Sequence, residues 1–268
     1  MIISDEHRFA FIHIPKCAGS TVRRQLSGID SYNGKFGRAT EHPVAGRLDY
    51  PHLPLRVLAE LFPDEFAKIR QYDSVALMRD PFERFLSSLL QRMRSWRRVA
   101  PSEFTREMLR QEAVSVIANL EPNPDRVRLE YSHFTRQCDY LDLNGEPIVH
   151  HVYSVDQLPA FSAFLEQRVG FGLDLKIRDN ASVIPRFAWM RASMNVLRPA
   201  YTKILPAQIK HLVRSVMLRQ HLYRDARETF LTDLMDEPLI SGFVEEFYRE
   251  DILRFRALTG DLAHQEYR

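Results

Sequence analysis

The sequence predicts an α/β protein in which a parallel sheet is flanked by helices and the C-terminal third is mostly helical. Two observations favour this class. Short apolar runs rich in β-branched and aromatic residues, which are typical of buried strands, fall at residues 8–14, 73–79 and 148–155. Helical patterns separate these runs, and strands that alternate with helices along a chain build parallel sheets.

A tight break and a helix follow the first strand. The run RFAFIHI ends at Pro15, and Ser20 with Thr21 offers a helix start. Residues 28–54 hold five Gly or Asn and three Pro, so we expect a long loop-rich segment there, of a kind that is often functional. A short helix at 55–62 then leads toward the second strand.

A long amphipathic helix follows the second strand. Apolar residues recur at three- and four-residue steps over 81–98, and Pro81 stands at the favoured first helical position. Another helix is expected at 102–120. Residues 125–141 are expected to be helical and then irregular.

The chain beyond the third strand is predicted to be mostly helical. Asp156 is the expected cap of a helix that runs to Gln167, and residues 170–185 have the composition of a loop. Further helices are expected at 187–197, 206–218, 225–235 and 238–258. No repeat or clear linker divides the sequence, so a single domain over 1–268 is predicted.

The composition excludes several classes of protein. The chain has 268 residues, of which 45% are hydrophobic and 27% charged, and this is ordinary for a soluble globular protein rather than a disordered or fibrous one. A net charge of +2 argues against nucleic-acid binding through bulk charge. No run resembles a signal peptide or a membrane span, and two cysteines do not make a secreted disulfide scaffold, so we expect a cytoplasmic location. Neither CxxC nor HExxH occurs, so no metal site is expected.

Arginine dominates the basic residues. Only 6 of the 37 Lys and Arg are Lys, which reflects either genomic base composition or binding of phosphate or sulfate, since the planar guanidinium grips such anions with two parallel bonds. Four of the arginines stand at the end of the helix 81–98. They indicate either a groove for an anionic sugar or a solvated helix end whose cations complement the dipole. Their positions are Arg92, Arg94, Arg97 and Arg98.

The stretch HIPKCAGST between the first strand and its helix has the layout of an anion cradle. A tight turn after a strand points backbone N–H groups inward, and the helix start adds partial positive charge. Gly19 allows a close approach of a ligand, Ser20 and Thr21 offer hydroxyl donors, and Lys16 adds a full charge. Lys16 comes three residues before the single Gly, so the stretch is not a Walker loop. The alternative is an ordinary turn with a surface lysine.

A second polar group follows the second strand in the stretch RDPFERFLSS. Arg79 ends the strand, and Arg84 and Ser87 lie one turn apart on the helix, where they can share a face. Ligands of open α/β sheets bind at this carboxyl edge of the strands, so Arg79 and Ser87 are candidates for a phosphate site. The alternative is an Asp80–Arg84 ion pair that only fastens the helix start.

Together the two stretches resemble the carbohydrate sulfotransferase family of the heparan and uronyl 2-O-sulfotransferase type. The similarity is specific over residues 9–90. It continues more weakly through His133-Phe134, Gln137 and Tyr140-Leu141, then through Val152-Tyr153, and finally through Phe247-Tyr248 and Asp251. The resemblance implies a P-loop-type α/β fold and sulfuryl transfer from PAPS (3′-phosphoadenylyl sulfate) to a carbohydrate or glycan hydroxyl, without a metal.

The resemblance also implies residue roles. Lys16 would contact the bridging oxygen between sulfate and the 5′-phosphate, where charge builds as the bond breaks. Arg79 and Ser87 would bind the 3′-phosphate. The turn would hold the 5′-phosphosulfate through Lys16, Cys17, Ala18, Gly19, Ser20 and Thr21. Cys17 is otherwise expected to be a small loop residue rather than a reactive thiolate.

The acceptor hydroxyl must lose a proton, and in this family a His or a Glu between the two motifs takes it. His52 is the first candidate, because it precedes a helix that leads into the second strand, and His42 and Glu41 are the others. By the same resemblance, the nucleotide base is expected to contact a polar loop. Its candidate residues are Arg178, Asn180 and Ser182.

Two other functions stay open at this stage. One is a P-loop phosphotransferase that uses ATP and Mg²⁺, which the displaced lysine disfavours. The other is a non-catalytic protein that binds anionic polysaccharide through its arginines. Animal members of the family carry an N-terminal membrane anchor, and none is seen here, so we expect a bacterial cytoplasmic relative or a chain from which an anchor was trimmed.

Overall fold

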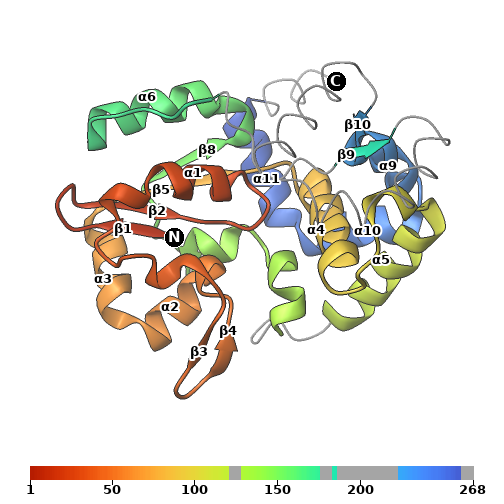
Figure 1. Cartoon of the computed structure of the whole chain (residues 1–268), viewed down its shortest axis with the longest axis horizontal. Helices are drawn as coiled ribbons and strands as arrows, with labels where there is room; N and C mark the ends of the chain where they lie inside the picture. Colours follow the sequence, from red (N-terminus) through yellow and green to blue (C-terminus); the bar gives the residue numbers. More distant parts are fainter. Residues whose placement is uncertain (121–127, 176–182, 186–222, 261–268) are drawn as a thin grey trace, which may run out of the picture.

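The structure is a computed structural model, and it describes residues 1–120, 128–175, 183–185 and 223–260 (Figure 1). The helices predicted at 187–197 and 206–218 lie outside these described residues. Within the described part of the chain, no helix is long and apolar enough to cross a membrane.

The central sheet has four strands in the order β1-β2-β5-β8 (Figure 1). Strand β2 (Phe9–Ile12), strand β5 (Asp73–Met78) and strand β8 (His151–Ser154) run parallel, which confirms the three predicted strands and the α/β class. Strand β1 (Ile2–Ser4) was not predicted, and it pairs antiparallel with β2. The sheet is therefore mixed rather than purely parallel.

Helices pack against this sheet. In Figure 1, α6 (Leu158–Val169) lies above the strands, and α2 (Leu55–Leu61) and α3 (Pro63–Gln71) lie below them. The sequence predicted a single helix at 55–62, but Pro63 starts a second one, because proline fits the first position of a helix. Helix α1 (Gly19–Gln25) follows β2 directly.

A group of helices packs around its own apolar cluster, on the side of the molecule away from β1 (Figure 1). Helix α4 keeps most of its predicted length and buries Phe85, Leu89 and Met93. The single helix predicted at 238–258 is wrong. The chain turns at Tyr248, whose buried hydroxyl donates to the Phe134 carbonyl at 2.6 Å. The helices of this group are α4 (Pro81–Ser95), α5 (Arg106–Leu120), α9 (Ala226–Met235) and α10 (Pro238–Phe247). Helix α11 (Arg249–Thr259) follows α10, and its Phe255 belongs to the apolar core of the sheet.

Other boundaries also differ from expectation. The helix expected from 102 begins at 106, and residues 128–141 form 3₁₀ turns at Leu129–Phe134 and Cys138–Tyr140 instead of an α-helix. Asp156 does not cap α6. Its own N–H donates to Ser154, which caps a short turn before that helix.

The remaining elements are short. The loop-rich segment 28–54 contains a hairpin of β3 (Thr40–His42) and β4 (Gly46–Leu48). Two more strand pairs are β6 (Asp142–Leu143) with β7 (Glu146–Pro147) and β9 (Val183–Pro185) with β10 (Tyr223–Asp225). Further 3₁₀ turns occur at Ser27–Ile29, Lys35–Gly37, Tyr50–His52, Pro101–Glu103 and Val155–Gln157. The single domain over 1–268 stays a prediction.

Candidate functional site

The turn between β2 and α1 is sharply bent. Lys16 (φ 68°) and Ala18 (φ 58°) both adopt the left-handed conformation, which is uncommon for residues with a Cβ and costs conformational energy. Ala18 is the residue before the helix, and no side chain caps the N-terminus of α1. Ser20 and Thr21 therefore lie inside the first helical turn and do not cap it, contrary to the sequence interpretation.

Gly19 is required by a neighbouring side chain. A Cβ at this position would lie 1.8 Å from Cδ2 of His13, so only glycine leaves room for the imidazole beneath the turn. His13 is buried, its Nδ1 has no hydrogen-bond partner, and burial holds its pKa well below the usual value. The sequence interpretation assigned this glycine to ligand approach, whereas the structure shows a packing reason for it.

The Lys16 ammonium lies in positively charged surroundings. Burial, with the nearby charges of Arg94 and Arg79, lowers the pKa of Lys16 to about 8. Among the described residues, no group accepts a hydrogen bond from Lys16 and no carboxylate pairs with it. Three cations that act on one another, with no carboxylate paired to the lysine in the described part of the chain, form a site that favours an anion.

Arg79 is held at the carboxyl end of β5 by its backbone. Its N–H donates to Gln137 Oε1 at 3.0 Å, and Gln137 Nε2 donates to the Arg79 carbonyl at 2.9 Å. The Arg79 side chain is only 13% exposed and lies 3.6 Å from the Glu83 carboxylate, while its buried Nε has no hydrogen-bond partner. A buried donor without an acceptor is costly, so the guanidinium has unused capacity for a ligand.

Cys17 contributes to the turn through packing. Its thiol donates to the Pro15 carbonyl and to Gln137 Oε1, at 3.5 and 3.3 Å. Gln137 therefore links this turn to the Arg79 strand end. Burial raises the pKa of Cys17 to about 11, so it carries no thiolate at neutral pH.

Arg84 fastens three segments together. Its fully buried guanidinium donates to the carbonyls of Pro15, at 3.2 Å, of His133, at 3.2 Å, and of Thr135. The alternative ion pair with Asp80 is wrong, because Asp80 instead accepts hydrogen bonds from the first amides of α4. Arg84 is thus a structural residue that fixes the distance between α4 and the Lys16 turn.

The polar face of α4 borders the lysine. Glu83, Ser87, Gln91 and Arg94 recur at three- and four-residue steps and are all half-buried, so they form one stripe along the helix. At one end of this stripe, Glu83 contacts Arg79. At the other end lies Arg94, whose charge acts on Lys16. Ser87 lies between these two points.

The other arginines at the end of α4 do not form a groove for an anionic sugar. Arg92 is buried and donates to Glu112 Oε1 at 2.5 Å, and Arg97 donates to Oε2 of the same carboxylate at 2.7 Å. Arg98 is exposed. Two of the four charges are thus paired with Glu112, the one of Arg92 buried and the one of Arg97 at the surface, and Arg94 is the one that acts on Lys16.

His52 lies directly behind the turn. Its Nδ1 is 3.1 Å from the carbonyl oxygen of His13, and a carbonyl can only accept, so Nδ1 carries the hydrogen and Nε2 keeps its lone pair. Burial, followed by the neighbouring His133, holds the pKa of His52 well below its usual value. This histidine is therefore neutral at neutral pH, with the lone pair of Nε2 unprotonated.

His133 and Asp49 join His52, and the sequence analysis gave neither a role. The His133 ring lies 5.1 Å from the His52 ring, centroid to centroid, and its Nε2 is 3.7 Å from Asp49 Oδ2. Burial, with Lys16 and Arg84, lowers the pKa of His133 to about 3. His133 appeared in the sequence only as part of a weak family similarity, and Asp49 stands in the loop-rich segment without any motif.

The donor atoms of Asp49, His52 and His133 lie within 4.8 Å of one another, and such a set can in composition hold a transition metal. Lys16 and Arg84 nevertheless act on His133, and Arg23 acts on Asp49. These positive charges disfavour a cation here.

His42 and Glu41 lie elsewhere, on the hairpin β3–β4. The Nδ1 atom of His42 accepts from the backbone N–H groups of Val44 and Ala45 at 3.3 and 3.2 Å, and its ring packs 5.4 Å from that of Phe62. These contacts of His42 include neither Lys16 nor His52, and Glu41 is exposed.

The candidates for the nucleotide base lie outside the described residues, so the structure says nothing of them. They are Arg178, Asn180 and Ser182.

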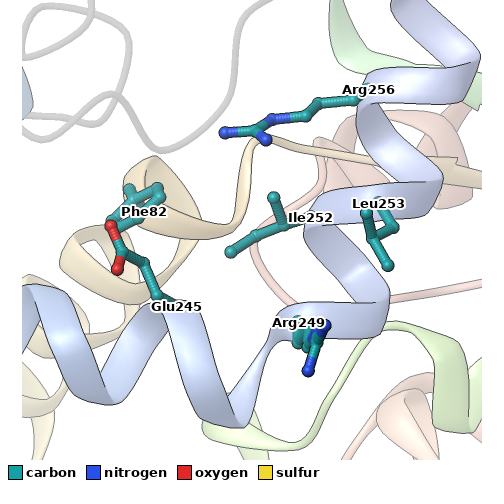
Figure 2. Close-up of a pocket in the computed structure, with 6 residues that line it drawn as sticks. All are labelled: Phe82, Glu245, Arg249, Ile252, Leu253 and Arg256. Carbon is teal, nitrogen blue, oxygen red and sulfur yellow. The ribbon is translucent and has the colours of Figure 1, made fainter. Parts of the chain in front are cut away.

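A cavity of about 330 Å³ lies between the start of α4 and helices α10 and α11 (Figure 2). Figure 2 shows Arg256 reaching from α11 across the cavity toward α4. Phe82 and Ser87 are five residues apart, about 140° around the helix, so the cavity lies on a different side of α4 from the Lys16 stripe. Its lining residues are Phe82, Glu245, Arg249, Ile252, Leu253 and Arg256.

The model of a family described as "Sulfotransferase family" matches residues 1–158. This match spans more than half of the chain and contains Lys16, Arg79 and His52 with their neighbours. Comparisons with curated proteins and with solved structures give no match. On this match, the chain belongs to the sulfotransferase family and is a transferase of the sulfuryl group.

Proposed function

We propose that this protein transfers a sulfuryl group from PAPS to a hydroxyl of a carbohydrate or glycan, with adenosine 3′,5′-bisphosphate as the second product. The observation that carries the proposal is the Lys16 ammonium, which lies near Arg79 and Arg94 and has no acceptor among the residues that the structure describes. A nucleotide with a 5′-phosphosulfate and a 3′-phosphate supplies the negative charge that this site lacks.

In the proposed complex, the β2–α1 turn acts as a P-loop-type cradle for the 5′-phosphosulfate. Backbone amides at Ala18 and Gly19, with the hydroxyls of Ser20 and Thr21, would contact the phosphate, whereas the Cys17 amide already donates to the Ile14 carbonyl. Lys16 would stabilise the charge that develops on the bridging oxygen as the sulfur–oxygen bond breaks. Because the transferred group carries a single negative charge, this chemistry needs no metal ion.

Arg79 and Ser87 would hold the 3′-phosphate. The Nε of Arg79 supports this role, because a phosphate oxygen would satisfy a buried donor that has no acceptor among the described residues. The half-buried position of Ser87 on the stripe between Glu83 and Arg94 also supports it.

His52 would act as the general base. Its Nε2 would take the proton as the acceptor oxygen bonds to sulfur, while the leaving phosphate oxygen keeps the electron pair of the broken bond. The neutral state of His52 and its fixed tautomer support this assignment. Three further parts of the proposal rest on the family resemblance. They are the carbohydrate acceptor, the cytoplasmic bacterial setting, and the contacts to the adenine of the nucleotide from Arg178, Asn180 and Ser182.

Nucleotide selectivity tests the proposal. We expect adenosine 3′,5′-bisphosphate to stabilise the full chain against heat, by about 2.7 kcal/mol when its concentration is 100 times its Kd. ATP with Mg²⁺ should stabilise the chain much less. Thermal unfolding with each nucleotide measures this. Stabilisation by ATP–Mg²⁺ alone would favour a phosphotransferase. No nucleotide effect together with salt-sensitive polysaccharide binding would favour a non-catalytic protein.

A further inference from the structure

Two separate segments bring His133 and Asp49 to the candidate base. The His52 and His133 rings meet edge to face, with their centroids 5.1 Å apart and their planes at 87°. Nε2 of His133 lies 3.7 Å from Asp49 Oδ2, and one ligand atom from each of the three residues lies within 4.8 Å of the other two. Catalytic hydrogen bonds are often this long before substrate binds, so the three groups are close enough to form a proton path.

Each member of this path is held by other residues. The His133 carbonyl accepts from Arg84 Nη2 at 3.2 Å and from Ser88 Oγ at 2.9 Å, which ties it to α4. Asp49 Oδ2 accepts from Ser132 Oγ at 2.9 Å. The Asp49 side chain is 15% exposed, so its carboxylate remains in contact with water.

The positive charges around the path disfavour a histidine that remains protonated. Two neutral groups also face the path, namely His13 and the Tyr140 hydroxyl, which donates to the His52 carbonyl at 3.3 Å. Asp49 is the carboxylate among the described groups of this cluster. The cationic groups that act on the path are Lys16, Arg23 and Arg84. The Met1 amine also lies near it, but burial lowers the pKa of this amine to about 4, so it is neutral at neutral pH.

We infer that His133 and Asp49 carry away the proton that His52 takes from the acceptor, an inference that rests on the proposed function. The hydroxyl O–H bond breaks as the new O–S bond forms, and the proton goes to His52 Nε2. It passes to a ring nitrogen of His133, and the Nε2 proton of His133 goes to Asp49, which releases it to water. Both residues act through His52 and are positioning residues for the transfer.

Asp49→Asn tests this in the full chain, with Asp64→Asn as the matched control, because Asp64 is exposed at the start of α3. We expect Asp49→Asn to lower kcat about tenfold or more, with KM and the stabilisation by adenosine 3′,5′-bisphosphate unchanged. Increasing concentrations of imidazole buffer should restore kcat in this variant and leave the wild type unaffected, because a mobile base replaces the missing proton acceptor. Steady-state sulfate transfer from pH 5.5 to 9 measures both effects.

His133→Ala is the second variant, since it leaves space for an imidazole molecule between His52 and Asp49. We expect its activity to recover with imidazole and not with imidazolium at low pH. The inference is overturned if Asp49→Asn transfers sulfate like Asp64→Asn, or if imidazole restores neither variant. A wild type that binds the nucleotide but transfers no sulfate refutes the proposed function, and the inference falls with it.

Discussion

Lys16→Ala is expected to lower kcat for sulfate transfer by about 10²–10³-fold, the usual loss when one preorganised group that stabilises developing charge is removed. The ammonium has no acceptor within the described protein, so its removal breaks no hydrogen bond or ion pair there. The variant should therefore stay folded. Transfer of labelled sulfate from PAPS, beside a thermal unfolding curve, measures both properties.

The pH dependence of nucleotide binding provides the control. Free Lys16 has a pKa of about 8, so the protonated form that attracts an anion is lost as pH rises through 8. A bound anion raises this pKa, and the wild-type affinity for adenosine 3′,5′-bisphosphate should therefore weaken above pH 8, whereas that of Lys16→Ala should change less. Full transfer activity in the variant would refute the role given to Lys16.

His52→Ala is expected to lower kcat by about 10²–10⁴-fold, the range that a positioned general base contributes. His52 contacts the Lys16 turn through the His13 carbonyl, and not through the groups proposed to hold the nucleotide. Stabilisation by adenosine 3′,5′-bisphosphate should therefore persist in the variant. Steady-state transfer assays combined with thermal unfolding separate the two effects.

His42→Ala is the matched histidine control, because its imidazole contacts its own hairpin and Phe62. It should keep most of the activity. The pKa of His52 lies well below its usual value, so the wild-type rate should hold at pH 6, where an ordinary histidine would already be protonated. If His42→Ala lost most of its transfer activity while His52→Ala stayed active, the general base would be His42 on the hairpin and not His52.

Local patterns predicted the elements that carry the two motifs. Strand β5 and helix α4 were expected almost at their observed bounds, because a buried apolar run, a proline at the first helical position and a strong amphipathic period all agree there. The same kinds of pattern predicted that Lys16 and Arg79 each follow a strand of a parallel sheet. Parallel strands end at one edge of a sheet, so the sequence already implied that the two residues are close.

Elements fixed by distant contacts could not be predicted in this way. Strand β1 has three residues, too few for any period, and it exists because it pairs with β2. The turn between α10 and α11 contains no Gly or Pro. It is fixed by Tyr248, whose hydroxyl reaches the Phe134 carbonyl across the helical group.

The candidate site was predicted only in part for the same reason. His52 could be ranked above His42 from its place before a helix, but its fixed tautomer depends on the His13 carbonyl, 39 residues away along the chain. The approach of His133 to Asp49 joins two loops, and no local spacing signals it. Arg84 likewise looked like a partner of Asp80, whereas its contacts are to backbone carbonyls that only the folded chain brings near.

The fate of the sulfuryl group in the wild-type protein tests the central claim most directly. The full chain is incubated with PAPS labelled in its sulfate and with a panel of carbohydrates, and both products are separated and counted. The proposed function predicts that label moves to a carbohydrate hydroxyl, with one adenosine 3′,5′-bisphosphate formed for each sulfate transferred. Label that stays on the nucleotide with every carbohydrate, while ATP and Mg²⁺ support phosphate transfer to the same panel, would contradict it.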